Sequence, residues 1–267
     1  MHVLVDGLQG GQVDPLDRGL NYGDGLFETI AVLDGRPRFL DWHLERLAGG
    51  AGRLGFPALD AALLRREIAA ITFGARCIVK LIVTRGSGPR GYRPPRPAST
   101  RRIVAAWDWP APPASAAAGA RVGWCRMRLG RNPALAGVKH LNRLEQVLAR
   151  AEWDDGVMDE GLMCDEGGSV ISATQANLFA KLAGRWVTPR LDQCGVAGVM
   201  RRAFCAWQAE QGSPVEERVL ARADIESASA LLLTNALAGA WPVRELEGRP
   251  VPVDGDCGEF SAWLARV

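Results

Sequence analysis

Residues 128–150, RLGRNPALAGVKHLNRLEQVLAR, place one lysine, Lys139, between an irregular Gly/Pro-rich segment and a helical pattern. The chain has only two other lysines, Lys80 and Lys181, while arginine supplies the rest of its strongly basic side chains. A guanidinium group stays protonated and cannot form a Schiff base. Any chemistry that needs an amine nucleophile therefore depends on one of these three lysines or on the N-terminus.

The three lysines differ in their sequence surroundings. Lys80 in CIVKLIVTR and Lys181 in NLFAKLAGRWV occupy apolar, strand-like runs, where an edge or solvent-facing strand residue is the simpler interpretation. Lys139 follows Gly137 and precedes an amphipathic helix that we expect at residues 141–153. A helix N-terminus and partial burial both favour a neutral amine. We therefore rank Lys139 first as the candidate nucleophile, with a capping or surface role as the alternative.

Composition narrows the class of protein. About half of the 267 residues are hydrophobic (48%), which is enough for one large domain or two modest ones. A net charge of +2 with interspersed acids and bases does not indicate a nucleic-acid or membrane-surface protein. The six cysteines are scattered without a CxxC pair, so we expect buried thiols in a reducing compartment and no metal site. The N-terminus MHVLVDGLQGG lacks the features of a signal peptide, and we expect a cytoplasmic protein.

Hydrophobic periodicity predicts a mixed α/β (α+β) chain in two lobes. The expected strands span residues 2–6, 28–33, 76–85, 101–107, 121–128, 160–164, 169–172, 177–182, 186–188 and 230–234. The expected helices span residues 41–54, 58–71, 141–153 and 199–211. Residues 108–120, DWPAPPASAAAGA, have no helical face and indicate an interdomain linker. We therefore expect a small N-terminal α/β domain at residues 1–107 and a larger C-terminal domain at residues 121–267 that carries Lys139.

Three glycine-rich segments could contribute to a site. DRGLNYGDGLFETI, residues 17–30, carries a tyrosine and a threonine between tight turns. TRGSGPRGY, residues 84–92, places arginine and tyrosine on a loop, as carboxylate binding requires. LDQCGVAGVMRR, residues 191–202, has a Gly-x-x-Gly turn that opens a helix, a typical phosphate seat. Each segment alone is more often a plain turn, and Arg46 in HLERL would alone be a solvated helix arginine.

Taken together, the chain carries six segments in the order found in one enzyme family: DRGLNYGDGLFET, HLERL, TRGSGPRGY, RLGRNPALAGVKHLNRLEQVLAR, QANLFAK and PRLDQCGVAGVMR. Over nearly its whole length the chain resembles the fold-type-IV pyridoxal-phosphate enzymes, the class IV aminotransferase-like family. Its HLNRLEQVL block is most typical of the aminodeoxychorismate lyases within that family. The resemblance implies a small α/β domain with a larger barrel-like α/β domain, pyridoxal 5′-phosphate as cofactor, and a homodimer with sites near the subunit interface.

The resemblance also implies how the cofactor is bound. Lys139 matches the lysine that forms the Schiff base, and Arg46 matches the arginine that binds the phosphate. Val199 and Met200 match residues at a helix start whose backbone N–H groups hold the phosphate. The turn at residues 234–237, which includes Asn235 and Ala236, matches another loop on the phosphate side.

Substrate contacts follow from the same resemblance. Arg90 and Tyr92 match loop positions that relatives use for substrate carboxylates, and Tyr22 matches a tyrosine of the pocket. Thr29 matches a threonine that assists proton transfer in the lyases.

One position departs from the family pattern. A glutamate usually stands five residues before the asparagine of the NLF motif and pairs with the protonated pyridine nitrogen of the cofactor. Counting back from Asn177 in VISATQANLF gives Ser172. Asp165 and Glu166 lie in the preceding turn and are not assigned that role. The departure affects the electronics of the cofactor rather than its binding.

The implied activity is conversion of 4-amino-4-deoxychorismate to 4-aminobenzoate and pyruvate in folate biosynthesis. Lys139 would remove the proton at the carbon that bears the amine, and Thr29 would help to protonate the leaving enol. Two alternatives stay open: a D-amino-acid or branched-chain aminotransferase of the same fold, and a pyridoxal-phosphate-binding homologue without turnover.

Overall fold

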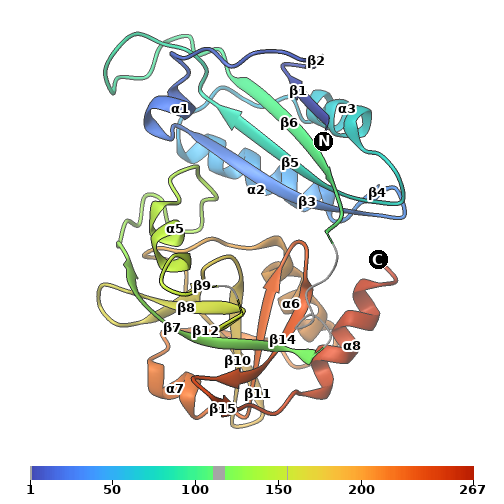
Figure 1. Ribbon diagram of the computed structural model, residues 1–267, viewed down its shortest axis with the longest axis vertical. Helices are drawn as coiled ribbons and strands as arrows, with labels where there is room; N and C mark the ends of the chain where they lie inside the picture. Colours follow the sequence, from blue (N-terminus) through green and yellow to red (C-terminus); the bar gives the residue numbers. More distant parts are fainter. Residues whose placement is uncertain (1, 111–117, 155) are drawn as a thin grey trace. The chain divides into compact units, whose positions relative to one another are not determined.

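The computed structural model describes residues 2–110, 118–154 and 156–267. It contains a six-stranded and a nine-stranded sheet with helices packed against them (Figure 1). The chain divides into two compact units, the first formed by Met1–Pro110 with Val138–Asn142 and the second by Ala111–Gly137 with Arg143–Val267. The predicted mixed α/β architecture is confirmed.

The first unit contains an antiparallel sheet and helices that pack against it. Its strands, in the spatial order β2-β1-β6-β5-β3-β4, are β2 (Leu8–Gln9), β1 (His2–Val5), β6 (Arg101–Asp108), β5 (Arg76–Thr84), β3 (Gly25–Leu33) and β4 (Arg36–Pro37). Its helices are α1 (Arg18–Tyr22), α2 (Leu40–Arg53) and α3 (Ala61–Ile71). The longest pairing joins β3 to β5 in continuous register from Gly25↔Thr84 to Leu33↔Arg76.

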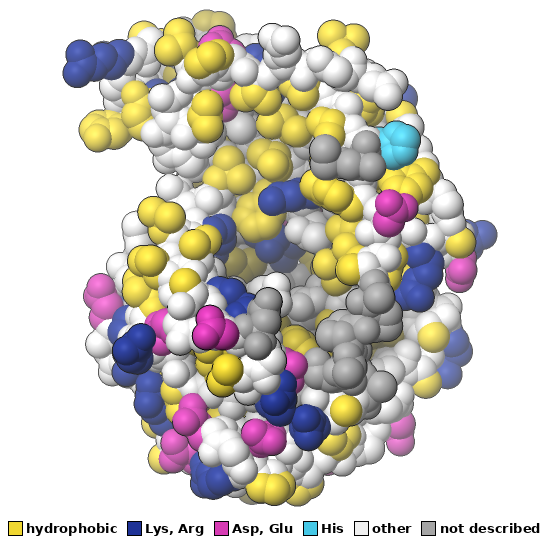
Figure 2. Space-filling view, viewed as in Figure 1, with side chains coloured by type: hydrophobic (Ala, Val, Ile, Leu, Met, Phe, Trp, Pro, Cys, Tyr) yellow, Lys and Arg dark blue, Asp and Glu magenta, His cyan; other side chains and the backbone are white. Residues whose placement is uncertain are grey.

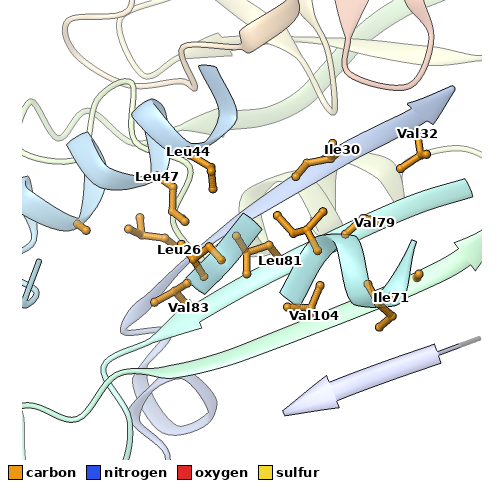
Figure 3. Close-up of a cluster of buried hydrophobic side chains, with 14 of the residues drawn as sticks. Leu26, Ile30, Val32, Leu44, Leu47, Ile71, Val79, Leu81, Val83 and Val104 are labelled. Carbon is orange, nitrogen blue, oxygen red and sulfur yellow. The ribbon is translucent and has the colours of Figure 1, made fainter. Parts of the chain in front are cut away.

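Strand alternation separates the two faces of this sheet. Even-numbered residues of β3, such as Leu26 and Ile30, are buried against Leu44 and Leu47 of α2 (Figure 3). The helical spacing of the two leucines puts both on one side of α2. Each large apolar side chain buried in this way contributes about 1.5–3 kcal/mol. The odd-numbered face of β3 carries Phe27 and Thr29, both half-buried, and Thr29 is one of the predicted site residues.

The segment that carries Lys139 belongs to the first unit, contrary to the predicted larger domain. Its backbone pairs with β3 like a short neighbouring strand. Phe27 N donates to Lys139 O (3.1 Å), and Leu141 N donates to Gly25 O (2.9 Å). Val138 is buried in the core of the same unit. These hydrogen bonds hold the segment in an extended form.

The helix expected at residues 141–153 therefore starts later than predicted. The observed helix is α5 (Leu144–Arg150), which begins five residues after Lys139. Lys139 therefore lies outside the first turn of this helix in the sequence.

The second unit is built on the nine-stranded sheet. Its strands are β7 (Ala120–Leu129), β8 (Glu160–Asp165), β9 (Val170–Ala173), β10 (Asn177–Leu182), β11 (Arg185–Pro189), β12 (Glu216–Arg218), β13 (Ala230–Asn235), β14 (Gly239–Leu246) and β15 (Arg249–Pro250). Its remaining helices are α6 (Val199–Glu210), α7 (Arg222–Glu226) and α8 (Gly255–Leu264). The sheet is mixed, since β7 runs parallel to both β8 and β14.

Aromatic packing fixes α6 and α8 in the second unit. Phe204 of α6 lies 4.7 Å from Phe179 of β10 and 5.0 Å from Phe260 of α8, measured between ring centres. All three rings are fully buried. On the face shown in Figure 2, acidic and basic side chains are interspersed over this unit. No helix in the described ranges is both long and apolar enough to cross a membrane.

The predicted linker at residues 108–120 is only partly covered by the description. Asp108 ends β6 and Ala120 begins β7. Residues 111–117 lie outside the described residues. The two units divide between Pro110 and Ala111.

Candidate active site

Lys181 is held in an ion-pair network. Its Nζ lies 2.7 Å from Asp254 Oδ2 and 3.2 Å from Asp256 Oδ2. Burial lowers the pKa of Lys181, but hydrogen bonds to the two aspartates outweigh it and raise that pKa above its ordinary value. Trp186 Nε1 also donates to Asp256 Oδ2 (2.7 Å). Lys181 is thus a charged anchor for the start of α8 and a poor nucleophile.

Lys139 has a different environment. It is half-buried, and its Nζ lies 4.3 Å from the centre of the Phe27 ring. Lys80 Nζ lies 5.3 Å from the centre of the same ring. The β3–β5 register pairs Lys80 with Thr29, which follows Phe27 on the same face of β3. Lys139 and Lys80 therefore lie near one aromatic ring of the first unit, and Thr29 lies on the same face of β3 as that ring.

A buried ionic cluster lies on the other side of β3. Glu28 is 1% exposed, and its carboxylate accepts hydrogen bonds from Arg46 Nε (2.8 Å), from Arg46 Nη2 and from His43 Nδ1 (2.7 Å). Burial raises the pKa of Glu28, but the charge of Arg46 and the hydrogen bonds outweigh it and lower that pKa. Burial is also the main cause of the lowered pKa of His43, which the nearby Lys139 charge lowers further.

At neutral pH this cluster is an ionised Glu28, a cationic Arg46 and a neutral His43. The neutral imidazole then donates its Nδ1–H to the carboxylate. Arg46 is consequently fixed by its Nε/Nη2 edge, in the fork geometry that arginine makes with carboxylates. Sequence reasoning singled out Arg46 but missed Glu28 and His43. The sequence did hold a signal for Glu28, because it alternates with the apolar Leu26 and Ile30 on the inward face of the strand. A carboxylate at such a position is strongly disfavoured unless it is paired.

A buried arginine anchors the predicted substrate loop. Arg18, 3% exposed, donates from Nη1 to Gly91 O (2.9 Å), from Nη2 to Tyr92 O (3.0 Å) and from Nε to Asp24 Oδ2 (2.8 Å). Sequence reasoning also missed this residue. Its guanidinium stacks over the Tyr22 ring at 4.8 Å.

The same loop brings Tyr22 and Tyr92 together. Gly91 N donates to the Tyr22 hydroxyl oxygen (3.1 Å), and the two tyrosine rings meet edge to face with centres 5.5 Å apart. Tyr92 is 86% exposed, and Arg90 beside it is exposed as well. The structure therefore presents these side chains on an anchored, exposed loop.

The start of α6 in the second unit suits an anion. Gly198 precedes the helix and provides no side-chain cap, and Val199 and Met200 are buried at its start. A Cβ at Gly198 would come within 2.1 Å of Asn177 Oδ1, so only glycine fits. The first N–H groups of a helix attract negative charge. This geometry fits the predicted phosphate contact of Val199 and Met200.

The turn after β13 is shaped by Asn235. Its Oδ1 accepts hydrogen bonds from Leu237 N (3.0 Å) and Ala238 N (2.8 Å), which bend the backbone around Ala236. Thr234 Oγ1 is buried without a hydrogen-bond partner among the residues that the structure describes. A buried hydroxyl without a partner is unfavourable unless a ligand satisfies it. This observation fits a bound phosphate-bearing cofactor on this side.

Ser172 lies on β9, 9% exposed and opposite Met163 of β8. Asp165 is unavailable as a substitute carboxylate, because it accepts from Arg131 Nε (2.9 Å) and from Ser169 N (2.9 Å). Glu160 is buried nearby in the chain, where burial raises its pKa, and its carboxylate accepts from Gly161 N, Thr174 Oγ1 and Gln175 N. Glu160 thus shapes the turn after β9, and Ser172 supplies a hydroxyl rather than a carboxylate at its position on β9.

The predicted site residues fall into two sets. The first unit holds Lys139, Thr29, Arg46, Tyr22, Arg90 and Tyr92, and the second unit holds Ser172, Val199, Met200, Asn235 and Ala236. No cluster of three or more metal-ligating side chains occurs within the described ranges. The chemistry of these residues fits pyridoxal phosphate, which needs a lysine for its aldehyde and N–H donors for its phosphate.

Comparison with known proteins identifies the family of the chain. Residues 25–246 match the family model described as amino-transferase class IV. The aminodeoxychorismate lyase of Vibrio harveyi is 32% identical over 97% of both chains. A putative branched-chain-amino-acid aminotransferase of Methanocaldococcus jannaschii is 31% identical over 90% of this chain and 84% of its own.

The fold is also similar to those of solved lyase and aminotransferase structures. The 4-amino-4-deoxychorismate lyase of Pseudomonas aeruginosa superposes with a TM-score of 0.92 at 44% identity, covering 99% of this chain and 98% of its own. The branched-chain amino acid aminotransferase of Escherichia coli shares the fold, with a TM-score of 0.89 at 23% identity over 100% of this chain and 94% of its own. The chain belongs to the class IV aminotransferase family of pyridoxal-phosphate-dependent enzymes.

Proposed function

We propose that this enzyme is an aminodeoxychorismate lyase of folate biosynthesis, which converts 4-amino-4-deoxychorismate to 4-aminobenzoate and pyruvate. The observation that carries the proposal is the 44% identity to a solved lyase over 99% of the chain. The solved branched-chain aminotransferase of Escherichia coli reaches 23% over a similar length. Lys181 is held by two aspartates, whereas Lys139 lies beside an aromatic ring, and this difference supports Lys139 as the amine of the proposed chemistry.

Pyridoxal phosphate, when bound, supplies the electron sink for the reaction. Lys139 Nζ would hold the cofactor, and its amine would remove the proton from the substrate carbon that bears the amine. The neighbouring C–O bond breaks, and Thr29 Oγ1 helps to protonate the departing enolpyruvyl group. Aromatisation of the ring drives the step. Proton transfer by a positioned side chain typically contributes about 10²–10⁴-fold in rate.

The cofactor phosphate is proposed to contact Arg46, whose guanidinium is already oriented by Glu28. The backbone N–H groups of Val199 and Met200 are proposed to donate to its oxygens, with the turn at Asn235 and Ala236 as a further contact. Preorganised donors of this kind cost little reorganisation when the charge arrives.

The substrate carries carboxylates, and the loop that presents Arg90 and Tyr92 is proposed to bind one of them. The anchoring of this loop by Arg18 supports the assignment, because a fixed backbone limits the entropy lost on binding. Tyr22 shares a hydrogen bond and a ring contact with the same loop and is proposed to line the pocket.

We also propose a cytoplasmic homodimer. The outer face of α5 exposes three apolar side chains at helical spacing, Leu144, Val147 and Leu148, at 75%, 58% and 56% exposure. An exposed apolar stripe of this kind supports burial against a second copy of the chain. All six cysteines are free thiols, which agrees with a reducing compartment.

One assay separates the lyase from its alternatives. Purified enzyme with aminodeoxychorismate should release 4-aminobenzoate, followed by fluorescence, and pyruvate in equal amounts. The resemblance to the Methanocaldococcus jannaschii protein favours an aminotransferase as the second candidate. An aminotransferase would instead convert its cofactor to the pyridoxamine form with an amino-acid donor. A homologue without turnover, suggested by Ser172, would do neither.

A further inference from the structure

One carboxylate oxygen of the first unit binds two buried arginines. Asp24 Oδ2 accepts hydrogen bonds from Arg18 Nε (2.8 Å) and from Arg85 Nε (2.8 Å). Arg18 and Arg85 are only 3% and 4% exposed. Burial raises the pKa of Asp24, but the hydrogen bonds from Arg85 and Arg18 outweigh it and lower that pKa. Asp24 is therefore ionised at neutral pH and is the shared counter-charge of both guanidinium groups.

Arg18 connects this carboxylate to the loop at residues 84–92, which presents Arg90. It donates from Nη1 to Gly91 O (2.9 Å) and from Nη2 to Tyr92 O (3.0 Å). A guanidinium group is planar, and its donors keep a fixed geometry relative to one another. A hydrogen bond at Nε therefore also sets the direction of the two terminal nitrogens. Because Asp24 fixes Nε, it determines where the backbone beside Arg90 is held.

Arg85 connects the same carboxylate to the end of α2. It donates from Nη1 to Gly55 O (3.0 Å) and from Nη2 to Leu54 O (2.7 Å), directly after the last residue of that helix. Its backbone N also donates to Asp24 O (3.1 Å). The other face of α2 packs in the hydrophobic core of the unit. Asp24 is thus fixed to a part of the first unit that the core holds in place.

We propose that Asp24 is a positioning residue for substrate binding, which fixes Arg18 and, through it, the loop that presents Arg90. The inference rests on the proposed function and deepens it, because the loop is held ready for a carboxylate of the substrate before the substrate arrives. A loop that is already ordered loses less entropy on binding. Loss of Asp24 should therefore weaken substrate binding and leave the chemical step at Lys139 nearly unchanged.

The first readout measures how firmly the loop is held, in holoenzyme and without substrate. Within residues 86–100, trypsin has one good cleavage site, the Arg90–Gly91 bond, because Arg93 and Arg96 each precede a proline. A protease cleaves a held segment mainly when that segment opens, so the rate follows the population of the open form. The rate of cleavage after Arg90 is therefore a direct measure of the anchoring.

Two single variants and their combination test the route from Asp24 to the loop. Arg18→Gln and Asp24→Asn should each increase the cleavage rate by about tenfold or more, the range expected when charge-assisted hydrogen bonds are lost. Because both act through the same contact, the double variant should cleave no faster than the faster single variant, whereas independent effects would multiply. Arg18→Lys keeps the charge beside Asp24 but cannot reproduce the fork geometry, and it should also be cleaved faster. This variant decides the question if Asp24→Asn does not fold.

Steady-state kinetics with aminodeoxychorismate give the second readout. Arg18→Gln and Asp24→Asn should raise KM by about tenfold or more with little change in kcat, because they weaken binding without altering the reacting groups. A purely structural loss would instead reduce the fraction of active enzyme, which lowers kcat and leaves KM unchanged.

Arg102→Gln is the matched control. Arg102 lies on β6 of the same unit, its Nε donates to both carboxylate oxygens of Glu67 (3.1 Å each), and its side chain is 21% exposed. The variant removes an ion-paired arginine from the same sheet. It should keep the wild-type cleavage rate at Arg90 and the wild-type KM.

The outcomes are distinguishable from those of the lyase assay. Wild-type cleavage rates in Arg18→Gln and Arg18→Lys overturn the inference, and so does an equal increase in Arg102→Gln. Multiplying effects in the double variant, or faster cleavage with an unchanged KM, overturn it as well. If the wild type forms no 4-aminobenzoate, the proposed function is refuted, while the cleavage rates still show whether Asp24 and Arg18 hold the loop.

Discussion

Replacing Glu28 by glutamine should destabilise the enzyme strongly. The carboxylate is 1% exposed and accepts from His43, also 1% exposed, and from Arg46, whose side chain is 15% exposed. The amide keeps the volume of the side chain but loses the charge, and its NH₂ group faces a donor. Breaking a buried ion pair typically costs about 3–5 kcal/mol. Because glutamine still accepts one hydrogen bond, we expect about 3 kcal/mol, the lower end of that range.

Thermal unfolding of the cofactor-free protein at pH 7.5 measures this cost without a contribution from cofactor binding. At roughly 2–4 °C per kcal/mol, the melting temperature should fall by about 6–12 °C. Asp41→Asn is the control, because the Asp41–Arg65 pair lies in the same unit but is 71% and 44% exposed. Such surface pairs contribute about 1 kcal/mol or less. Equal, small shifts in both variants would refute the assignment of Glu28 as a buried counter-charge.

Three further predictions concern the cluster and the cofactor. Arg46→Ala should raise the dissociation constant for pyridoxal phosphate by about 10–150-fold, measured by absorbance titration; an unchanged constant would return Arg46 to a purely structural role. The pKa of His43 is lowered from 6.5, so the unfolded chain takes up more protons as the pH falls through 6.5, and stability is lost there. His43→Gln should therefore lose less melting temperature than wild type between pH 7 and pH 5, and identical losses would contradict this. Ser172→Glu should increase pyridoxamine-phosphate formation with D- or L-alanine and leave lyase activity within about tenfold, and no gain in the alanine reaction would make Ser172 a neutral substitution.

Local patterns predicted the elements whose own sequence is strongly periodic. The strand expected at residues 76–85 is observed as Arg76–Thr84, and the helix expected at residues 199–211 is observed as Val199–Glu210. β14 (Gly239–Leu246) was missed, because Gly239 and Pro242 weaken its local strand pattern. Its backbone hydrogen bonds with β13 and β7 stabilise the strand conformation that the local sequence does not predict.

The site was harder to predict, because its key contacts join distant residues. Lys139 stands where the local pattern suggests the approach to a helix, yet hydrogen bonds to β3 extend its backbone. HLERL alone indicates a solvated helix face, whereas His43 and Arg46 turn toward Glu28, a residue on another element. The motif resemblance singled out Arg46 without its local environment. Neither periodicity nor motif spacing indicates that the carboxylate of Glu28 is the partner of His43 and Arg46.

The most direct test of the account is to locate the cofactor by borohydride reduction. Trypsin separates the three lysines, because arginines bound the peptides 77–85, 132–143 and 151–185, which carry Lys80, Lys139 and Lys181 in that order. Mass spectrometry of the reduced holoenzyme should find the phosphopyridoxyl group on peptide 132–143, and Lys139→Ala should lose both the label and the cofactor absorbance. A label on the peptide of Lys80 or Lys181 instead would contradict the assignment of Lys139 as the centre of the chemistry.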